Sequence, residues 1–142
     1  MRDELIELWL LRHAQSLGNV ANDAAHAAGE HRLDLADRDM DVPLSELGRR
    51  QAAAFGDWLR EQPADEQPDA VVASPYVRAA DTARVVVETA ELDVRIVHDE
   101  RLREREFGIL DLLTRRGIEA AFPQEAERRA RLGKVYYRPP GG

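Results

Sequence analysis

The sequence predicts an α/β fold with a mostly parallel sheet, and three observations support this class. Three short apolar runs, 5–11, 69–73 and 94–97, have the length and composition of buried strands. Apolar residues recur at helical spacing in the segments between them, 45–60 and 76–90. Alternation of strands and helices is typical of a parallel sheet with crossover helices. A three-stranded sheet is small, so both of its edges would need cover.

Local signals place the start of the first two helices. Ser45 follows Pro43 and is a suitable N-cap, with Gly48 tolerated in the first turn of a helix that runs to Arg60. Ser74-Pro75 ends the second strand and starts the helix that we expect over 76–90.

The rest of the chain has weaker patterns. Residues 18–41 show no clear period and are expected to hold either a short helix or a mobile loop. The remaining segments are a charged connection at 101–108, two helices at 114–122 and 123–131 that end before Gly133, and an irregular tail at 138–142. Trp9 and Trp58 are expected in the core, and residues 1–142 are expected to form one domain.

Composition limits the classes of function. The hydrophobic fraction of 44% and the charged fraction of 33% are ordinary for a soluble domain. A net charge of −7 argues against a nucleic-acid partner. No apolar run approaches the roughly 20 residues that span a bilayer, so no membrane partner is expected. The absence of cysteine excludes disulfides and thiolate metal sites, and we expect a cytoplasmic location.

Polar side chains with phosphate chemistry follow each predicted strand. The carboxyl ends of parallel strands meet at one edge of a sheet, so these side chains are expected to converge. Arginine presents a planar fork to phosphoryl oxygens, and histidine is a nucleophile near neutral pH. The candidates are Arg12, His13, Ser16 and Asn19 after the first strand, Ser74 and Arg78 after the second, and Glu104 after the third.

Four segments then suggest a family. Residues 11–19, 41–52, 74–83 and 102–108 resemble, in this order, the signature blocks of the histidine phosphatase superfamily, which includes the cofactor-dependent phosphoglycerate mutases. The resemblance implies a three-layer phosphoglycerate mutase-like fold with a mostly parallel sheet. It covers the first two-thirds or so of the family domain, so the fold is expected to be incomplete at the C-terminus.

The resemblance also implies roles for the site residues. His13 would form a phosphohistidine, and neighbouring arginines would lower its pKa and keep it neutral. Glu104 would be the general acid for the leaving oxygen and then the base for water. Arg12 and Arg78 would bind the phosphoryl oxygens, with further hydrogen bonds from Asn19 and Ser16. No metal or cofactor is implied, because the arginines already supply positive charge.

The chain departs from the family pattern in several places. Ala14 replaces the glycine that usually follows the histidine, and Leu112 stands where many mutases have glycine. The family has a second histidine late in the domain, but no histidine follows Glu104 here, and His98 precedes it.

These patterns predict a phosphomonoesterase that acts on a small phosphorylated metabolite through a phosphohistidine. A mutase is the nearest alternative. Mutases of the family usually have tyrosine at the position of Phe107 and an Arg-Arg pair where Tyr137-Arg138 precedes the prolines, which favours the phosphatase. A truncated, non-catalytic domain that binds phosphate or a protein partner is the third possibility. An uncovered sheet edge would favour a homodimer.

Overall fold

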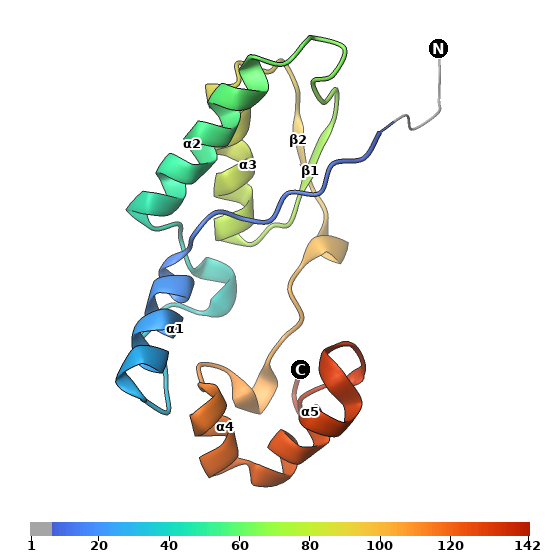
Figure 1. Cartoon of the computed structure of the whole chain (residues 1–142). Helices are drawn as coiled ribbons and strands as arrows, with labels where there is room; N and C mark the ends of the chain where they lie inside the picture. The colour runs from blue at the N-terminus through green and yellow to red at the C-terminus, as the bar shows by residue number, and fades with distance from the viewer. Residues whose placement is uncertain (1–6) are drawn as a thin grey trace.

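The computed structural model describes residues 7–142. The helices and strands are α1 Leu17–Ala28, α2 Glu46–Arg60, β1 Val71–Ala73, α3 Val77–Thr89, β2 Ile96–His98, α4 Arg115–Ala121 and α5 Pro123–Tyr136. Short 3₁₀ helices are η1 Asp39–Asp41, η2 Glu100–Leu102 and η3 Gly108–Leu110. Figure 1 shows α2, α3 and the strands at one end of the molecule and α4 and α5 at the other. The fold is α/β, as the sequence predicts.

The first core lies between α2 and α3. Ala52 and Leu59 of α2 pack with Val86 of α3 and Ala90 at its C-cap, and all four are buried. β1 and β2 lie beside this pair of helices and form a parallel two-stranded sheet. Both helices start and end within one residue of the predicted bounds, because Ser45 caps the Gly48 N–H (3.0 Å) and Pro75 precedes the start of α3.

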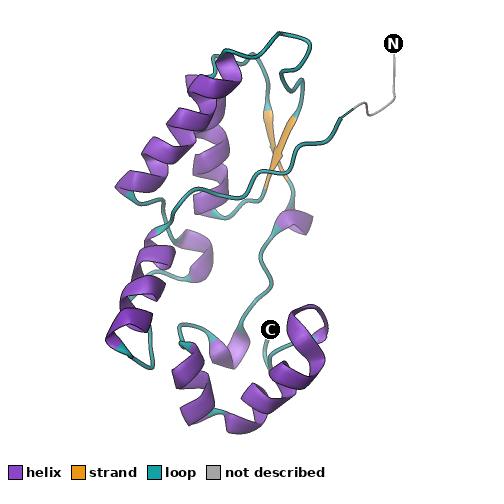
Figure 2. Ribbon diagram, viewed as in Figure 1, coloured by secondary structure: helices purple, strands orange, loops and turns teal. Residues whose placement is uncertain are grey.

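The first predicted strand, 5–11, is wrong for the residues that the structure describes. Residues 5 and 6 lie outside the described part, and 7–11 are extended but join no ladder with β1 or β2 (Figure 2). Leu10 is 90% exposed, and Trp9 and Trp58 stack on each other near the surface rather than in the core. An apolar run alone does not make a strand, because a strand also needs a neighbouring backbone to bond.

A second core joins α4 and α5. Leu110, Ile118 and Tyr137 are buried together, and the Tyr137 hydroxyl donates to Glu125 (2.8 Å). The helix break predicted at Gly133 is present as a kink with a φ of 72°, after which α5 continues to Tyr136. None of the helices in the described part of the chain has the length and apolar character needed to cross a membrane.

Residues 18–41, for which the sequence leaves a short helix or a mobile loop open, contain most of helix α1. It begins beside α2, where the Leu17 N–H donates to the Pro43 carbonyl (3.0 Å). It ends beside α4, where the Thr114 N–H donates to the His31 carbonyl (3.1 Å) and the Thr114 hydroxyl donates to Glu30 (2.7 Å). The helix therefore links the two cores by hydrogen bonds at both of its ends.

Candidate active site

The loop that carries His13 is tied to the helix that carries Arg78. The Ala14 N–H donates to the Thr82 hydroxyl (3.1 Å), and that hydroxyl donates in turn to the Arg78 carbonyl (2.7 Å). Thr82 is buried in α3, one turn after Arg78. This chain of two hydrogen bonds fixes the spacing between the candidate nucleophile and the candidate phosphate ligand.

A second set of bonds holds the loop on the N-terminus of α2. The Gln15 carbonyl accepts from the Ser45 N–H (2.9 Å), and the Gln15 N–H donates to the Gln51 side chain (3.0 Å). A Cβ on Gly48 would collide with the Gln15 carbonyl. Glycine is therefore required at this position by close packing of the loop, and is not merely tolerated in the helix.

The His13 ring has a defined tautomer. Its Nδ1 lies 2.8 Å from the Ala14 carbonyl oxygen, which can only accept, so Nδ1 carries the proton and Nε2 has the free lone pair. The pKa of His13 is lowered from its usual 6.5, mainly by burial and then by Arg78 and Arg12. The direction matches the prediction, but burial is the larger cause. No sequence pattern indicates that the Ala14 carbonyl supplies the acceptor.

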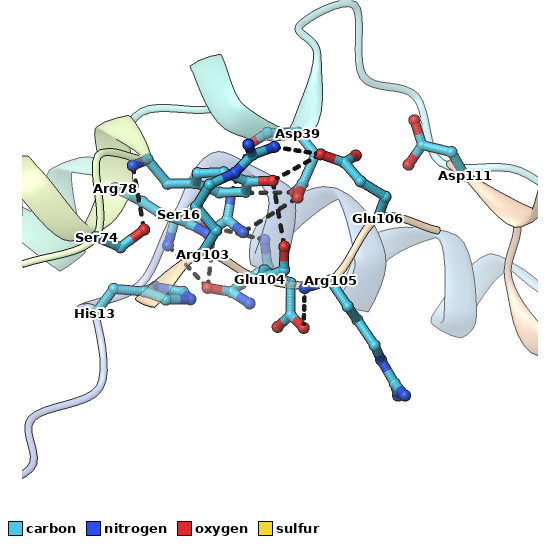
Figure 3. Close-up of polar contacts among 12 residues, drawn as sticks. His13, Ser16, Asp39, Ser74, Arg78, Arg103, Glu104, Arg105, Glu106 and Asp111 are labelled. Carbon is cyan, nitrogen blue, oxygen red and sulfur yellow. Dashed lines mark hydrogen bonds and ion pairs between the residues drawn. The ribbon is translucent and has the colours of Figure 1, made fainter. Parts of the chain in front are cut away.

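Arg78 is buried and ion-paired. Its side chain is 9% exposed and donates through Nη1 to the Asp39 carbonyl (2.5 Å) and through Nη2 to the Asp39 carboxylate (3.3 Å). The other carboxylate oxygen lies 3.0 Å from Nη1 as an ion pair. The guanidinium also lies 4.9 Å from the centre of the Tyr76 ring. Figure 3 shows His13 and Arg78 on the left of this group of polar side chains.

Ser16 and Asn19 form the cap of α1. The Asn19 side-chain oxygen accepts from the Ser16 N–H (2.9 Å), and the Asn19 N–H donates to the Ser16 hydroxyl (3.2 Å). Ser16 is buried at 3% exposure. Both residues lie next to the His13 loop, but the contacts that the structure gives them are those of a capping box. Their contact with phosphate stays a prediction.

Arg12 lies at the surface with its guanidinium available. Among residues 7–142 its side chain makes no hydrogen bond or ion pair, and the residue is exposed. It still lowers the pKa of His13, which places its charge close to the ring.

Glu104 approaches this group through its backbone. The Glu104 carbonyl accepts from the Tyr76 hydroxyl (3.4 Å), and its carboxylate accepts from the Arg105 N–H (3.1 Å). Glu106, in contrast, is paired with Arg103 (2.6 Å) and points to the other side of the segment in Figure 3. Of these two acids, Glu104 has the side chain without an ion pair among the described residues, as a proton donor requires.

Sequence reasoning missed Asp39, Tyr76 and Thr82. Asp39 lies in a charged stretch without periodicity, so nothing in the sequence singles it out. Nothing in the sequence singles out Thr82 within the helix either, but its hydroxyl joins the His13 loop to α3. Ser74 accepts from the Tyr76 N–H (3.3 Å) and so shapes the turn before Arg78.

No metal site accompanies this cluster in the described part of the chain, where no group of three or more Asp, Glu or His side chains is arranged to hold an ion. A cavity of about 120 Å³ lies behind the loop. Its lining is largely apolar, with Phe55 and Val86 among its walls, so it is a packing gap between the first segment and α2–α3 rather than a place for an anion.

Comparison with known proteins assigns the family. Residues 8–142 match the sequence model of the histidine phosphatase superfamily, branch 1. The chain belongs to this superfamily. The matched range includes all four sequence blocks, and the two structural cores both lie within it.

Individual relatives agree with this assignment. A 2,3-bisphosphoglycerate-dependent phosphoglycerate mutase 2 of Gloeobacter violaceus is 32% identical over 95% of this chain and 54% of its own length. A glucosyl-3-phosphoglycerate phosphatase of Mycobacterium tuberculosis is 37% identical over 82% of this chain and 44% of its own length. The native structure of the mycobacterial phosphatase has a TM-score of 0.64 and 35% identity, covering 92% of this chain and 52% of that one. The histidine phosphatase chain described here thus spans about half the length of these relatives.

Proposed function

We propose that this chain belongs to a phosphomonoesterase that acts on a small phosphorylated metabolite, with His13 as the nucleophile. The observation that carries the proposal is the 2.8 Å contact between Nδ1 of His13 and the Ala14 carbonyl, which implies the tautomer of the ring. Its proton lies on Nδ1, bonded to the Ala14 carbonyl, and its lowered pKa keeps the ring neutral. A neutral imidazole with a free Nε2 lone pair is the form that attacks phosphorus.

The reaction has two steps. In the first, the Nε2 lone pair of His13 forms a bond to phosphorus while the bond from phosphorus to the leaving oxygen breaks, and Glu104 gives a proton to that oxygen. In the second, Glu104 takes a proton from water as the water oxygen attacks phosphorus, and the bond from phosphorus to Nε2 breaks. Inorganic phosphate leaves, and His13 and Glu104 return to their starting forms.

Arg12 and Arg78 supply the positive charge for the phosphoryl oxygens. Charge spreads over these oxygens in the transition state, so fixed guanidinium groups stabilise it without reorganising. Arg78 is buried in α3 and held by Thr82 and Asp39, whereas Arg12 lies at the surface next to the nucleophile. The two arginines would therefore bind the group from a buried side and from an exposed side.

The test is to trap the intermediate. We expect the chain, incubated with para-nitrophenyl phosphate and quenched in base, to carry one phosphohistidine at His13, detected by mass spectrometry. The variant His13→Asn should lose it and lose hydrolysis by about a thousandfold or more. His26→Asn, an exposed position in the last turn of α1, is the control and should behave as wild type. Hydrolysis at the wild-type rate by His13→Asn would contradict the proposal.

A phosphoglycerate mutase-type transfer is the second candidate, because the Gloeobacter relative has that name. The products distinguish the two. With 3-phosphoglycerate and a trace of 2,3-bisphosphoglycerate, a mutase gives 2-phosphoglycerate, whereas a phosphatase gives free phosphate and glycerate. Phosphate binding without any phosphohistidine would instead indicate a non-catalytic domain.

A cytoplasmic location and the absence of nucleic-acid and membrane partners are also proposals. The chain has no cysteine and a net charge of −7, which suit a reducing compartment and a small-molecule partner. A homodimer is supported by the strand residues Val72 and Val97, which are exposed on the two-stranded sheet. Analytical ultracentrifugation of the chain measures this directly.

A further inference from the structure

We propose that Asp39 determines the anion affinity of the phosphate site, as an internal carboxylate that occupies Arg78 and competes with phosphate for it. The inference rests on the proposed function, since it takes Arg78 as a phosphate ligand. It adds a residue that the sequence pattern does not assign, and it concerns how tightly an anion is held and how readily it leaves.

The contacts of Arg78 are those of an occupied anion site. A guanidinium has five N–H donors, and Asp39 accepts from two of them, one through its carbonyl and one through a carboxylate oxygen. Its other carboxylate oxygen lies 3.0 Å from Nη1 as an ion pair. Two terminal nitrogens facing two carboxylate oxygens is the fork geometry with which arginine also binds phosphate. A phosphoryl group that binds Arg78 in this way must therefore replace the Asp39 carboxylate.

Burial explains why such a carboxylate is present. Arg78 is 8% exposed, and a buried cation without a partner is costly. The Asp39 side chain is 31% exposed, so its carboxylate has access to water when it leaves the guanidinium. The Asp39 carbonyl bond to Nη1 does not depend on the side chain and can hold Arg78 in place while an anion binds.

The charge of the site leads to the same conclusion. With His13 neutral, Arg12, Arg78 and Asp39 carry a net charge of +1, from two cations and one anion, and without the carboxylate the charge is +2. A dianionic phosphate near Asp39 is repelled, and when it departs Asp39 pairs with Arg78 again. The carboxylate therefore weakens the binding of product phosphate and favours its release.

The experiment measures the dissociation constant of inorganic phosphate by isothermal titration calorimetry on the chain and on Asp39→Asn. The asparagine keeps the size of the side chain and an acceptor for Arg78 but removes the charge. We expect the variant to bind phosphate roughly tenfold more tightly at low salt, with a smaller gain at high salt because the repulsion is screened. Asp41→Asn is the matched control. Asp41 lies in the same η1 helix and pairs with the exposed Arg38, so its removal should leave the constant within about twofold.

Unchanged or weaker phosphate binding by Asp39→Asn would overturn the inference, the weaker binding indicating that Asp39 only positions Arg78. Absence of phosphate binding by both proteins would overturn it as well. Asp39→Ser, which is smaller and also uncharged, replaces Asp39→Asn if the latter does not fold by circular dichroism, and the same tightening is expected. These equilibria need no turnover, so a missing phosphohistidine would reject the proposed function without altering this result.

Discussion

At the scale of single residues, the site depends on which polar atoms are already engaged. The Ala14 carbonyl engages Nδ1 of His13, and Asp39 engages both terminal nitrogens of Arg78. What remains for a substrate is the Nε2 lone pair, the surface guanidinium of Arg12 and the other donors of Arg78. The reactivity of each group thus follows from the partner that holds its other atoms.

The lowered pKa of His13 gives a prediction for pH. Its folded pKa is below the ordinary 6.5 of the unfolded chain, so the unfolded chain binds the proton more readily. The part of the stability that depends on neutral His13 is present above about 6.5 and is lost as the pH falls through the folded pKa. We expect the thermal midpoint of the wild type, measured relative to that of His13→Asn, to decrease when the pH is lowered from about 7.5 to about 5. A proton NMR titration should place the midpoint of His13 below 6.5, and a midpoint at or above 6.5 would contradict this.

Part of the site could be predicted at this scale. Arg12, His13, Arg78 and Glu104 come from sequence blocks whose residues are close together along the chain. Asp39 could not be predicted, because its pairing with Arg78 joins residues 39 positions apart and its neighbours in sequence are also charged. The structural use of Ser16 and Asn19 in the cap of α1 was likewise hidden, since a capping box and a phosphate ligand need the same polar atoms.

At the scale of elements, α2 and α4 begin in the same way. Each has a hydroxyl cap that accepts from the N–H of a glycine three residues on, Ser45 with Gly48 and Thr114 with Gly117. At each start a backbone carbonyl from another loop occupies the space that a Cβ on the glycine would need. This carbonyl belongs to Gln15 at Gly48 and to His31 at Gly117. These two loops flank the two ends of α1. The same combination of a hydroxyl cap and a glycine packed against a carbonyl therefore holds both ends of this helix.

This repeat offers a matched pair of substitutions. In an open helix Gly→Ala is stabilising, but here the added methyl meets backbone, so we expect both Gly48→Ala and Gly117→Ala to lower the free energy of unfolding by about 1–3 kcal/mol in denaturant titrations. Only Gly48→Ala displaces Gln15 and the adjacent His13, so it alone should weaken phosphate binding. Equal loss of phosphate binding in both variants, or a gain in stability in either, would show that the close approaches do not constrain the loops.

Helices and strands differed in how well the sequence predicted them. The bounds of α2 and α3 follow from signals within a few residues, the Ser45 cap and Ser74-Pro75, and the structure confirms them. The first strand, expected at 5–11, depends on a partner backbone that no local signal reports. β1 and β2 form, but with Val72 and Val97 exposed rather than buried, because the described residues place no layer over that face of the sheet.

At the scale of the whole molecule, the described residues form two separate cores. Ala52, Leu59, Val86 and Ala90 form the core of α2 and α3, and Leu110, Ile118 and Tyr137 form the core of α4 and α5. The connections between them are α1, bonded at both ends, and the charged segment 99–107 (Figure 1). His13 and Arg78 lie with the first core, whereas Glu104 lies on the connection, so the relative position of the cores sets the distance between the proposed nucleophile and the proposed acid.

A substitution that leaves a cavity in one core should therefore lower the stability of that core more than the stability of the other. Trp9 and Trp58 both lie at the first core, with ring centres 5.7 Å apart, so tryptophan fluorescence reports on that core alone, whereas circular dichroism at 222 nm reports on all the helices. We expect Ile118→Ala, which costs about 2–5 kcal/mol of local stability, to lower the denaturant midpoint by circular dichroism while the fluorescence midpoint stays near that of the wild type. Leu59→Ala should lower both. Coincident midpoints in Ile118→Ala would show that α1 and the 99–107 segment couple the cores into one cooperative unit.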